Sequence, residues 1–215
     1  MKKTVVIFAA LLFALGLNAQ DVRFGIKAGF NLSQFSETTF KEEGYQDGKN
    51  DASKMLPGFH VGGLINFSFG EFFGLQPELL FSTQGGKFED EVFGDTKVKY
   101  NYINLPVLFE VRPFTNFSIM VGPQVGLNVY RAFSEGGITI KGSAVNDLFK
   151  EEFGVKSNTL DFAAVCGLQY LVNGNCLISA RYNAGFQPVW VSDMSGYKIT
   201  GMSNRVIQFS LGWVF

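Results

Sequence analysis

The chain has 215 residues, of which 17% are charged and 15% aromatic, and its formal net charge is -1. An average soluble domain carries about 25% charged residues, so this chain is poor in charge. The near-neutral balance gives no electrostatic reason to expect a nucleic-acid partner. One histidine and two cysteines leave little material for a metal site, and we expect neither a metal nor a cofactor.

The first 19 residues have the composition of a secretory signal peptide. Two lysines precede an apolar stretch over Val5–Leu17, and Ala19 supplies the small residue of a cleavage site before Gln20. No cysteine lies near the cut, which argues against a lipoprotein anchor. An uncleaved anchor helix is the alternative, but about 13 apolar residues fall short of the roughly 20 that a span requires. We therefore predict a signal peptide over residues 1–19 and one mature domain over 20–215.

Eight later segments alternate between apolar and mostly polar or small residues. A period of two places the apolar set on one face of a strand and the other set on the opposite face. Each segment has about ten residues, the length with which a tilted strand crosses hydrocarbon. Pro77, Pro106 and Pro123 each predict a bulge or a local break in pairing, because proline lacks the ladder donor. The segments are approximately 24–33, 59–69, 75–82, 103–112, 117–129, 160–170, 178–187 and 206–215.

The connections between these segments alternate in length. The short ones lie near Gly70–Gly74, Pro113–Asn116 and Val172–Gly174, and Asn-Gly in the third favours a tight hairpin. The long ones cover approximately Gln34–Gly58, Thr83–Tyr102, Tyr130–Thr159 and Pro188–Asn204. This sorting is typical of outer-membrane barrels with periplasmic turns and external loops, whereas a soluble β-domain, the alternative, has no reason to show it.

Hydrogen bonding favours the same architecture. In lipid every backbone donor and acceptor needs an internal partner, so the strands must close into a ring without an edge. We therefore predict an all-β fold, an eight-stranded antiparallel up-and-down transmembrane β-barrel in the outer membrane. Aromatic residues should form a girdle at each water boundary. We expect Phe69, Phe72, Phe73, Phe114 and Phe117 at the short-turn boundary, and Phe35, Phe59, Tyr130, Phe186 and Trp190 at the long-loop boundary.

Several strand motifs resemble a known family. Phe24–Ser33 (FGIKAGFNLS) and Tyr102–Leu108 (YINLPVL) are similar to the opening and mid-chain strands of the PorT-like outer-membrane β-barrel family, and further matches occur at Gly122-Pro123, Arg181–Gly185 and Phe215. The resemblance implies an outer-membrane location and a small barrel of the OmpX-like kind. The named member of the family is associated with protein secretion across the outer membrane. Because the shared motifs are strand motifs, that role is not carried over to this chain.

Charged side chains also occur on the predicted inner face. Eight strands enclose only enough space for side chains to fill, so these groups must pair with one another. We interpret them as a hydrogen-bonded ion-pair network that holds the barrel, with Glu78 and Arg181 as the central pair. The alternative is a narrow polar conduit or a small-ligand pocket. The inward charged residues are Lys27, Glu78, Glu110, Arg112, Asp161 and Arg181.

His60 and the two cysteines are the remaining reactive side chains. A histidine beside a serine or an aspartate can activate a nucleophile, but no G-x-S-x-G or comparable signature surrounds His60. We predict a hydrogen-bonded lumen residue near the outer rim of its strand and no catalytic residue. If Cys176 lies opposite Tyr170, its Cα is roughly 13 Å from that of Cys166 by the strand rise. A disulfide needs about 7 Å or less, so both should be free thiols facing lipid.

Two long connections carry further patterns. Residues 36–54 are rich in charge, and Asp47–Asp51 hints at calcium but lacks the spacing of an EF-hand loop, so we predict a solvated external loop. Asn146–Phe153 has the pattern of a short amphipathic helix, in which Phe149 and Phe153 are neighbours that cap the barrel or contact a partner.

The last strand ends on an aromatic residue. We expect Trp213 and Phe215 to serve as the signal read by the barrel-assembly machinery, which would be a partner together with outer-membrane lipid. The expected role is structural or surface-binding, through the four long external loops and without catalysis. A small passive or gated channel, an accessory of a protein-export complex and a lipid-modifying enzyme are the alternatives. The sequence identifies neither an external ligand nor an export-complex partner.

Overall fold

The computed structural model describes residues 21–36, 38–42, 48–50, 53–90, 94–135, 138–141, 155–157, 159–187, 190–194, 197–200 and 203–215. The predicted signal peptide and the predicted helix over Asn146–Phe153 lie outside these residues. The long strands are β1 (Asp21–Phe35), β4 (Lys54–Phe69), β5 (Phe73–Asp90), β6 (Gly94–Phe114), β7 (Phe117–Glu135), β10 (Leu160–Val172), β11 (Cys176–Gly185) and β14 (Asn204–Val214).

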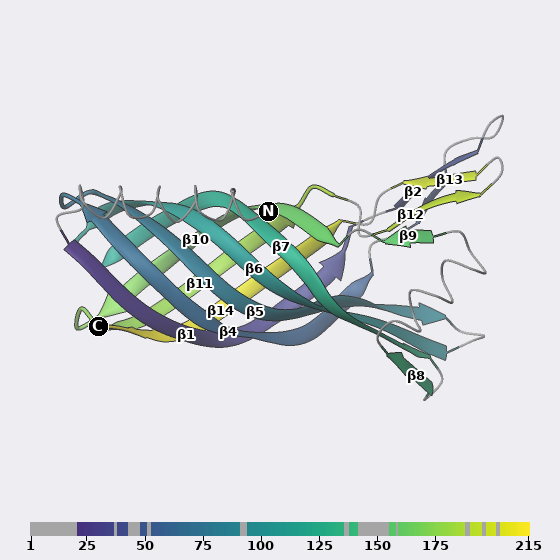
Figure 1. Ribbon diagram of the computed structural model, residues 1–215, viewed down its shortest axis with the longest axis horizontal. Coiled ribbons are helices and arrows are strands. Elements are labelled where there is room, and N and C mark those ends of the chain that lie inside the picture. The colour runs from purple at the N-terminus through teal and green to yellow at the C-terminus, as the bar shows by residue number, and fades with distance from the viewer. Residues whose placement is uncertain are drawn as a thin grey trace, which may run out of the picture.

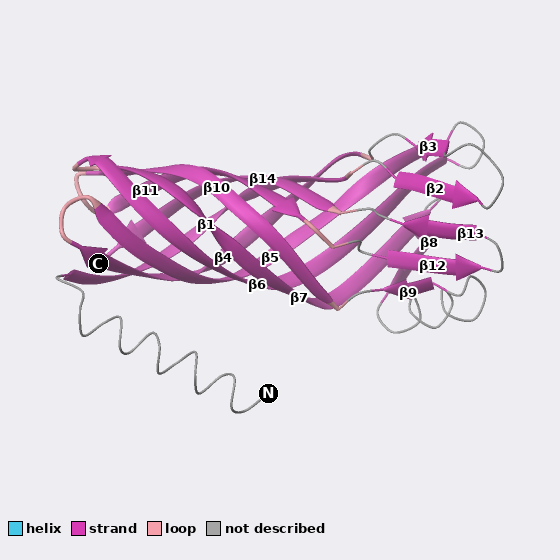
Figure 2. Ribbon diagram, turned by 90° about the horizontal axis from the view of Figure 1, so that it is seen from above, coloured by secondary structure: helices cyan, strands magenta, loops and turns pink. Residues whose placement is uncertain are grey.

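These eight strands form one closed antiparallel barrel (Figures 1 and 2). Strands adjacent in the barrel follow the order β10-β11-β14-β1-β4-β5-β6-β7, and β7 pairs with β10 to close the ring. The last strand returns beside the first, with Gly25 opposite Val214 and Phe35 opposite Asn204. The predicted fold is therefore confirmed. The described residues contain no helix that is long and apolar enough to cross a membrane.

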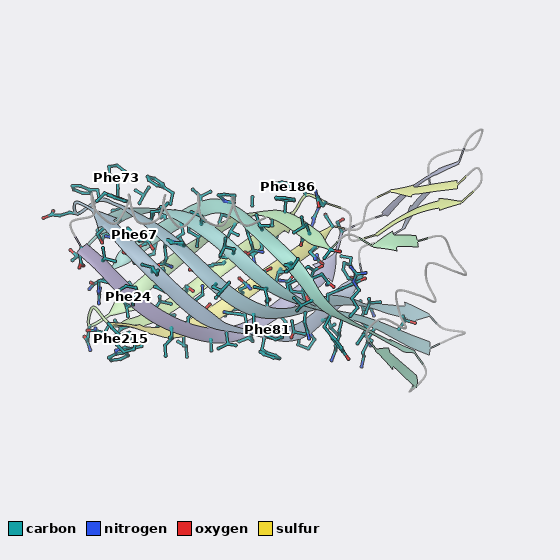
Figure 3. The ribbon with its side chains drawn as sticks, viewed as in Figure 1. Phe24, Phe67, Phe73, Phe81, Phe186 and Phe215 are labelled. Atoms are coloured by element: carbon teal, nitrogen blue, oxygen red, sulfur yellow. The ribbon has the colours of Figure 1, made fainter. Side chains whose placement is uncertain are left out.

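The side chains of the barrel are sorted by face as the alternation predicts. On β1, Phe24 and Ile26 are 58% and 59% exposed, whereas Lys27 and Asn31 are buried. Large apolar side chains project from the outer wall on every strand, among them the labelled Phe24, Phe73, Phe186 and Phe215 (Figure 3). In a membrane these apolar side chains would face the acyl chains. The backbone N–H and C=O groups are hydrogen-bonded between neighbouring strands, as hydrocarbon requires.

Three short turns join the strands at one end of the barrel, which we call the short-turn end. Between β10 and β11, Asn173 and Gly174 have φ values of 52° and 76°, as a type I′ turn requires. Val172 pairs with Cys176, so the expected pairing of Cys176 with Tyr170 is wrong by two residues. Both cysteines are free, and Cys166 lies beside Tyr182 on the exposed outer face.

At the opposite end, the long-loop end, the strands continue well beyond the predicted boundaries. The β5–β6 ladder runs from Phe73↔Val111 to Asp90↔Gly94, so the expected loop over Thr83–Tyr102 is wrong and is instead a long hairpin. β7 also continues to Glu135 and pairs with β8 (Ile138–Lys141). The β6 extension alternates over Val98, Tyr100 and Tyr102, but these apolar side chains face inward, opposite to the outward apolar face by which the membrane-crossing strands were identified.

A second sheet is built from three of the long connections. It contains β2 (Thr38–Glu42), β3 (Gly48–Asn50), β9 (Val155–Ser157), β12 (Trp190–Met194) and β13 (Tyr197–Thr200), in the order β3-β2-β13-β12-β9. It extends away from the barrel at the long-loop end (Figures 1 and 2). Within the calcium-like segment only Gly48–Asn50 is described, and it forms a strand.

The three prolines interrupt pairing without shifting its register. The ladders skip two positions between Leu64↔Glu78 and Phe67↔Leu75, beside Pro77, and between Pro106↔Gln124 and Phe109↔Val121. The predicted local breaks are confirmed, and the predicted bulges are not found at these residues. The register shifts of these ladders lie elsewhere, between Met55 and His60 on β4 and at two places on β6.

Candidate functional site

The centre of the lumen holds one carboxylate between two cations. Arg181 on β11 donates from Nη1 and Nη2 to the two oxygens of Glu78 on β5, each at 2.7 Å. Lys27 Nζ on β1 lies 2.7 Å from Glu78 Oε2, so a second cation is paired with the same carboxylate. The three side chains are at most 3% exposed. They come from three strands, so the contact ties distant parts of the wall together.

A second ion pair lies nearer the short-turn end. Arg112 donates to Glu110 Oε2 at 2.8 Å, to Asn66 Oδ1 at 2.7 Å and to Ser68 Oγ at 2.9 Å. This pair borders a polar cavity of about 110 Å³, which is also lined by Asp21, Arg23 and the turn residue Thr115. The guanidinium is already satisfied by protein oxygens, so it is poorly placed to capture an anion.

Two glutamines connect these ion pairs. Gln76 Nε2 donates to Glu78 Oε1 at 2.7 Å and to Gln169 Oε1 at 3.2 Å. Asn66 Nδ2 donates to both Gln76 Oε1 and Glu110 Oε2, at 3.0 and 2.9 Å. A continuous hydrogen-bonded network therefore runs from Arg112 to the central carboxylate. Such a network rigidifies a barrel when its members are satisfied.

His60 belongs to a separate buried cluster with Asn31 and Ser210. Its Nδ1 lies 2.7 Å from Asn31 Oδ1 and its Nε2 lies 2.8 Å from Ser210 Oγ. Asn31 Nδ2 donates to the backbone carbonyl oxygens of Phe59 and Thr83, at 3.1 and 3.0 Å, and this fixes the amide with Oδ1 toward the ring. Oδ1 therefore accepts the Nδ1 proton, and Nε2 accepts the serine hydroxyl proton. The order amide–imidazole–hydroxyl is that of a hydrolase triad, but the three side chains are at most 3% exposed and the nucleophile faces the packed lumen.

Aromatic side chains occupy the lumen toward the long-loop end. Phe35 packs edge-on against Tyr100, with ring centroids 6.0 Å apart, and Tyr102 completes the cluster. Phe35 is fully buried, so its predicted place in the outer girdle is wrong, because its parity on β1 is that of Lys27. Tyr100 lies in the strand extension, where burial raises its pKa to about 12, and Arg131 stacks 5.7 Å from its ring centroid.

Asp161 lies beside this aromatic cluster. Its Oδ2 accepts a hydrogen bond of 3.1 Å from Asn204 Nδ2, which also donates to the hydroxyl of Tyr102. Its Oδ1 has no hydrogen-bond partner among the described residues, although the side chain is only 8% exposed. A carboxylate buried in this way is costly, since burial removes hydration and a single amide replaces it.

Apolar side chains are also buried in the lumen. Leu108, Met120 and Val165 form one cluster, and Leu64, Leu177 and Val214 form another. Side chains thus fill the lumen at several levels, as expected for a ring of eight strands. In the part of the chain that is described, no group of three His, Cys, Asp or Glu side chains could hold a metal ion.

All six charged residues predicted on the inner face lie in the lumen, and Glu78 contacts Arg181, its expected partner. Glu110 and Arg112 also contact each other, whereas Asp161 lies apart from both ion pairs. The sequence interpretation missed the neutral members of the networks. Their inward parity was already visible and could have identified them. These residues are Asn31, Asn66, Gln76, Gln169 and Ser210.

Residues 18–190 match the outer membrane protein beta-barrel domain family. No curated protein matches the sequence. Among solved structures, the chain is similar to the attachment invasion locus protein Ail of Yersinia pestis, at 18% identity and a TM-score of 0.41, covering 91% of this chain and all of that one. It is also similar to the outer membrane protein OprG of Pseudomonas aeruginosa, at 15% identity and a TM-score of 0.49, covering 92% and 98%. Neisserial surface protein A has 13% identity and a TM-score of 0.49, covering 91% and 98%.

Proposed function

The chain belongs to the outer membrane protein beta-barrel domain family, and we propose that its barrel anchors a strand-built binding surface outside the cell. In this proposal the short turns face the periplasm and the long-loop end faces the exterior. The protein is then a surface-binding protein, not a conduit or an enzyme. Its specificity resides in the five-stranded sheet.

The five-stranded sheet is the observation that carries the proposal. It joins connections that lie more than 150 residues apart in sequence, since β13 pairs with β2 through Tyr197↔Glu42 and Thr200↔Thr39. A binding surface ordered before its partner arrives avoids part of the entropy cost of association. Among the described strands, β3 and β9 lie at the two edges of this sheet, and such edges can accept a strand from a partner.

The filled lumen supports this role over that of a channel. Glu78, Arg181 and Lys27 meet across the middle of the barrel, and a clear path would require this buried contact to separate. Breaking a buried ion pair without replacing its partners costs about 3–5 kcal/mol. A passive channel would need that contact to be absent.

Burial likewise argues against a lipid-modifying enzyme. The Ser210 hydroxyl is held by His60 inside the wall, whereas acyl chains surround the outside. An accessory role in protein export, which the resemblance to the PorT-like family implies, would use the same external surface with a protein partner. That role would be a special case of the proposed function, in which the bound partner belongs to a protein-export complex.

The test compares three chains in intact cells. One is wild type, one has residues 37–52 and 188–202 replaced by short turns to remove the sheet, and one has the tip of the β5–β6 hairpin shortened as a matched control. A membrane-impermeant biotin reagent reports orientation, and chemical cross-linking reports adducts. We expect the long-loop end to be labelled, and the same discrete adduct in wild type and control but not in the chain without the sheet. Identical adducts in all three, or labelling of the short turns alone, would contradict the proposal.

A further inference from the structure

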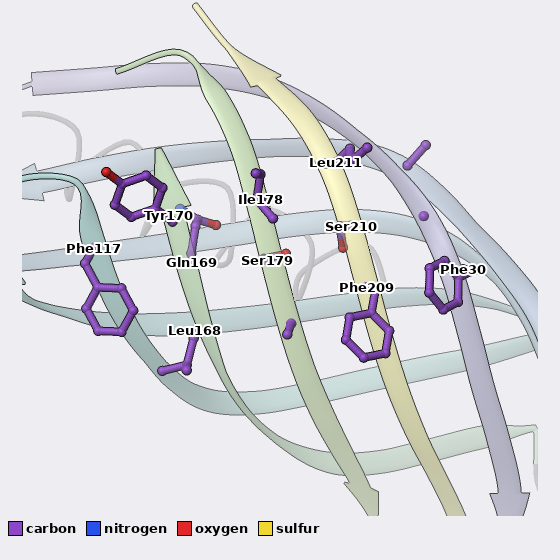
Figure 4. Close-up of a pocket in the computed structure, with 13 residues that line it drawn as sticks. Phe30, Phe117, Leu168, Gln169, Tyr170, Ile178, Ser179, Phe209, Ser210 and Leu211 are labelled. Atoms are coloured by element: carbon purple, nitrogen blue, oxygen red, sulfur yellow. The ribbon is translucent and has the colours of Figure 1, made fainter. Parts of the chain in front are cut away.

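The outer wall of the barrel is not evenly covered by large side chains. A groove of about 460 Å³ crosses β10, β11, β14 and β1 and begins beside the first residue of β7. Figure 4 shows Phe117 and Leu168 on one side of it and Phe209 and Phe30 on the other. The last two rings are stacked, with centroids 5.1 Å apart, and make one firm wall.

The register explains why a groove forms here. Across neighbouring strands Leu168 lies opposite Ala180, Ala180 lies opposite Phe209, and Phe209 lies opposite Phe30. Ala180 therefore presents a single methyl group between larger neighbours. In the next row Ala28 does the same beside Leu211. The recess spans three inter-strand intervals, about 14 Å at the usual spacing of about 4.8 Å.

One end of the groove reaches the short-turn boundary. Tyr170 pairs with Phe117 at the end of the β7–β10 ladder, next to the turn, and its side chain is about half exposed. A tyrosine at this level places its ring in hydrocarbon and its hydroxyl at the polar headgroups. The rest of the lining is almost entirely apolar and continues toward the middle of the membrane-facing wall. The groove therefore has a polar mouth and an apolar body.

We propose that this groove binds one acyl chain of a membrane phospholipid, with its headgroup beside Tyr170. The groove is part of the surface that already faces the membrane, so acyl chains are the molecules present at it. The side chains that line an empty groove lose dispersion contacts. A flexible acyl chain can enter the narrow groove and restore those contacts, which it cannot do to the same extent on a flat part of the wall. A phospholipid satisfies both ends of the groove, because its chain matches the apolar body and its headgroup matches the hydroxyl.

A second copy of this chain is the competing occupant. A barrel–barrel contact would have to insert a row of rigid side chains into a recess whose floor is two methyl groups. It would also displace the lipid headgroup from beside the hydroxyl of Tyr170. The groove is independent of the external sheet, so this inference goes beyond the proposed function, and either one can fail without the other.

The test uses native mass spectrometry of the full barrel. The protein is reconstituted in vesicles of dioleoyl phosphatidylethanolamine and phosphatidylglycerol, extracted into mild detergent, and its retained lipid is counted. Ala180→Phe fills the groove, and Ala28→Phe fills its other recess. Ala164→Phe is the matched control, because Ala164 faces out of β10 opposite Ala184 and does not line the groove. Heat-modifiable gel mobility verifies that each variant is folded.

We expect one retained phospholipid per wild-type barrel and per Ala164→Phe barrel. At least one of the two groove variants should be folded, and it should retain at least fivefold less phospholipid per barrel than wild type. Equal retention by the folded groove variants and the control would overturn the inference, as would the absence of a discrete retained lipid in wild type. A wild-type dimer that the groove variants dissociate would assign the groove to a second copy instead.

Discussion

Glu78 on β5 and Arg181 on β11 meet across the lumen through two hydrogen bonds of 2.7 Å. Lys27 adds a second positive charge to the same carboxylate, so the buried centre carries two cations and one anion. Removing the anion leaves both cations uncompensated, whereas removing one cation leaves a neutral pair. The carboxylate is therefore the member of this group whose loss should be most damaging.

We predict that Glu78→Gln lowers the free energy of unfolding by about 3 kcal/mol or more, because it leaves two buried cations without a counter-charge. Urea titration of the barrel in lipid vesicles, followed by tryptophan fluorescence, measures the change. Glu71→Gln is the matched control, since Glu71 is exposed in a short turn. Lys27→Met should cost less than Glu78→Gln. The reverse order would show that the ammonium, and not the carboxylate, holds the centre together.

His60 provides a second prediction. His60→Ala removes the partner of Ser210 and one partner of Asn31 and leaves a cavity, so stability should fall by about 2 kcal/mol or more. Ser210→Ala removes a single hydroxyl and should cost about 1 kcal/mol. Neither His60→Ala nor Ser210→Ala should change the rate at which the protein hydrolyses phospholipid in mixed micelles, compared with wild type. Loss of a measurable hydrolytic activity in Ser210→Ala would restore the enzymatic alternative.

Gly29 should be intolerant of any side chain. A Cβ on Gly29 would overlap the backbone carbonyl oxygen of Phe209 on the neighbouring strand, which cannot move without breaking the ladder. Gly29→Ala should therefore prevent assembly or reduce its yield in vesicles severalfold. Gly63→Ala is the control, because the nearest atom to its Cβ would be 3.6 Å away. Equal folding yields for the two variants, read from heat-modifiable gel mobility, would show that the wall adjusts more readily than the contact implies.

Asp161 should respond in the opposite direction from Glu78. Its carboxylate is buried with one amide partner and one oxygen without a partner among the described residues. Asp161→Asn keeps the shape and removes the charge, so we expect stability to stay constant or to rise by about 1 kcal/mol. The same urea titration measures it. A loss as large as that of Glu78→Gln would indicate that the charge of Asp161 is compensated by a partner.

The transmembrane part of the fold could be predicted because lipid imposes a strict pattern. Each strand must present apolar side chains outward, so the parity of Phe24 against Lys27, or of Leu79 against Glu78, assigns the faces directly. The pairing of Glu78 with Arg181 followed from two opposite charges of inward parity near the middle of their strands. The neutral network around Gln76 was missed because uncharged residues were not treated as network members.

Outside the membrane, strands could not be predicted from an outward apolar face. Strands such as β2 and β13 pair across a large sequence separation and have no hydrocarbon-facing side to impose alternation. The continuation of β5 and β6 past Ser82 and Tyr102 was missed because apolar side chains of this part, such as Tyr100, face inward and not outward. Phe35 was misplaced because it was assigned by its position near a boundary, and its parity was not applied.

The most direct test of the account asks whether the mature chain needs an amphiphile to fold. Residues 20–215 are diluted from urea into plain buffer, into detergent micelles and into lipid vesicles, and are compared by far-ultraviolet circular dichroism, gel mobility without heating and sedimentation. Because the outer wall is apolar all the way around, we predict a monodisperse folded barrel only with detergent or lipid, and aggregation in buffer. A monomeric, fully folded β-protein in buffer alone would contradict the account.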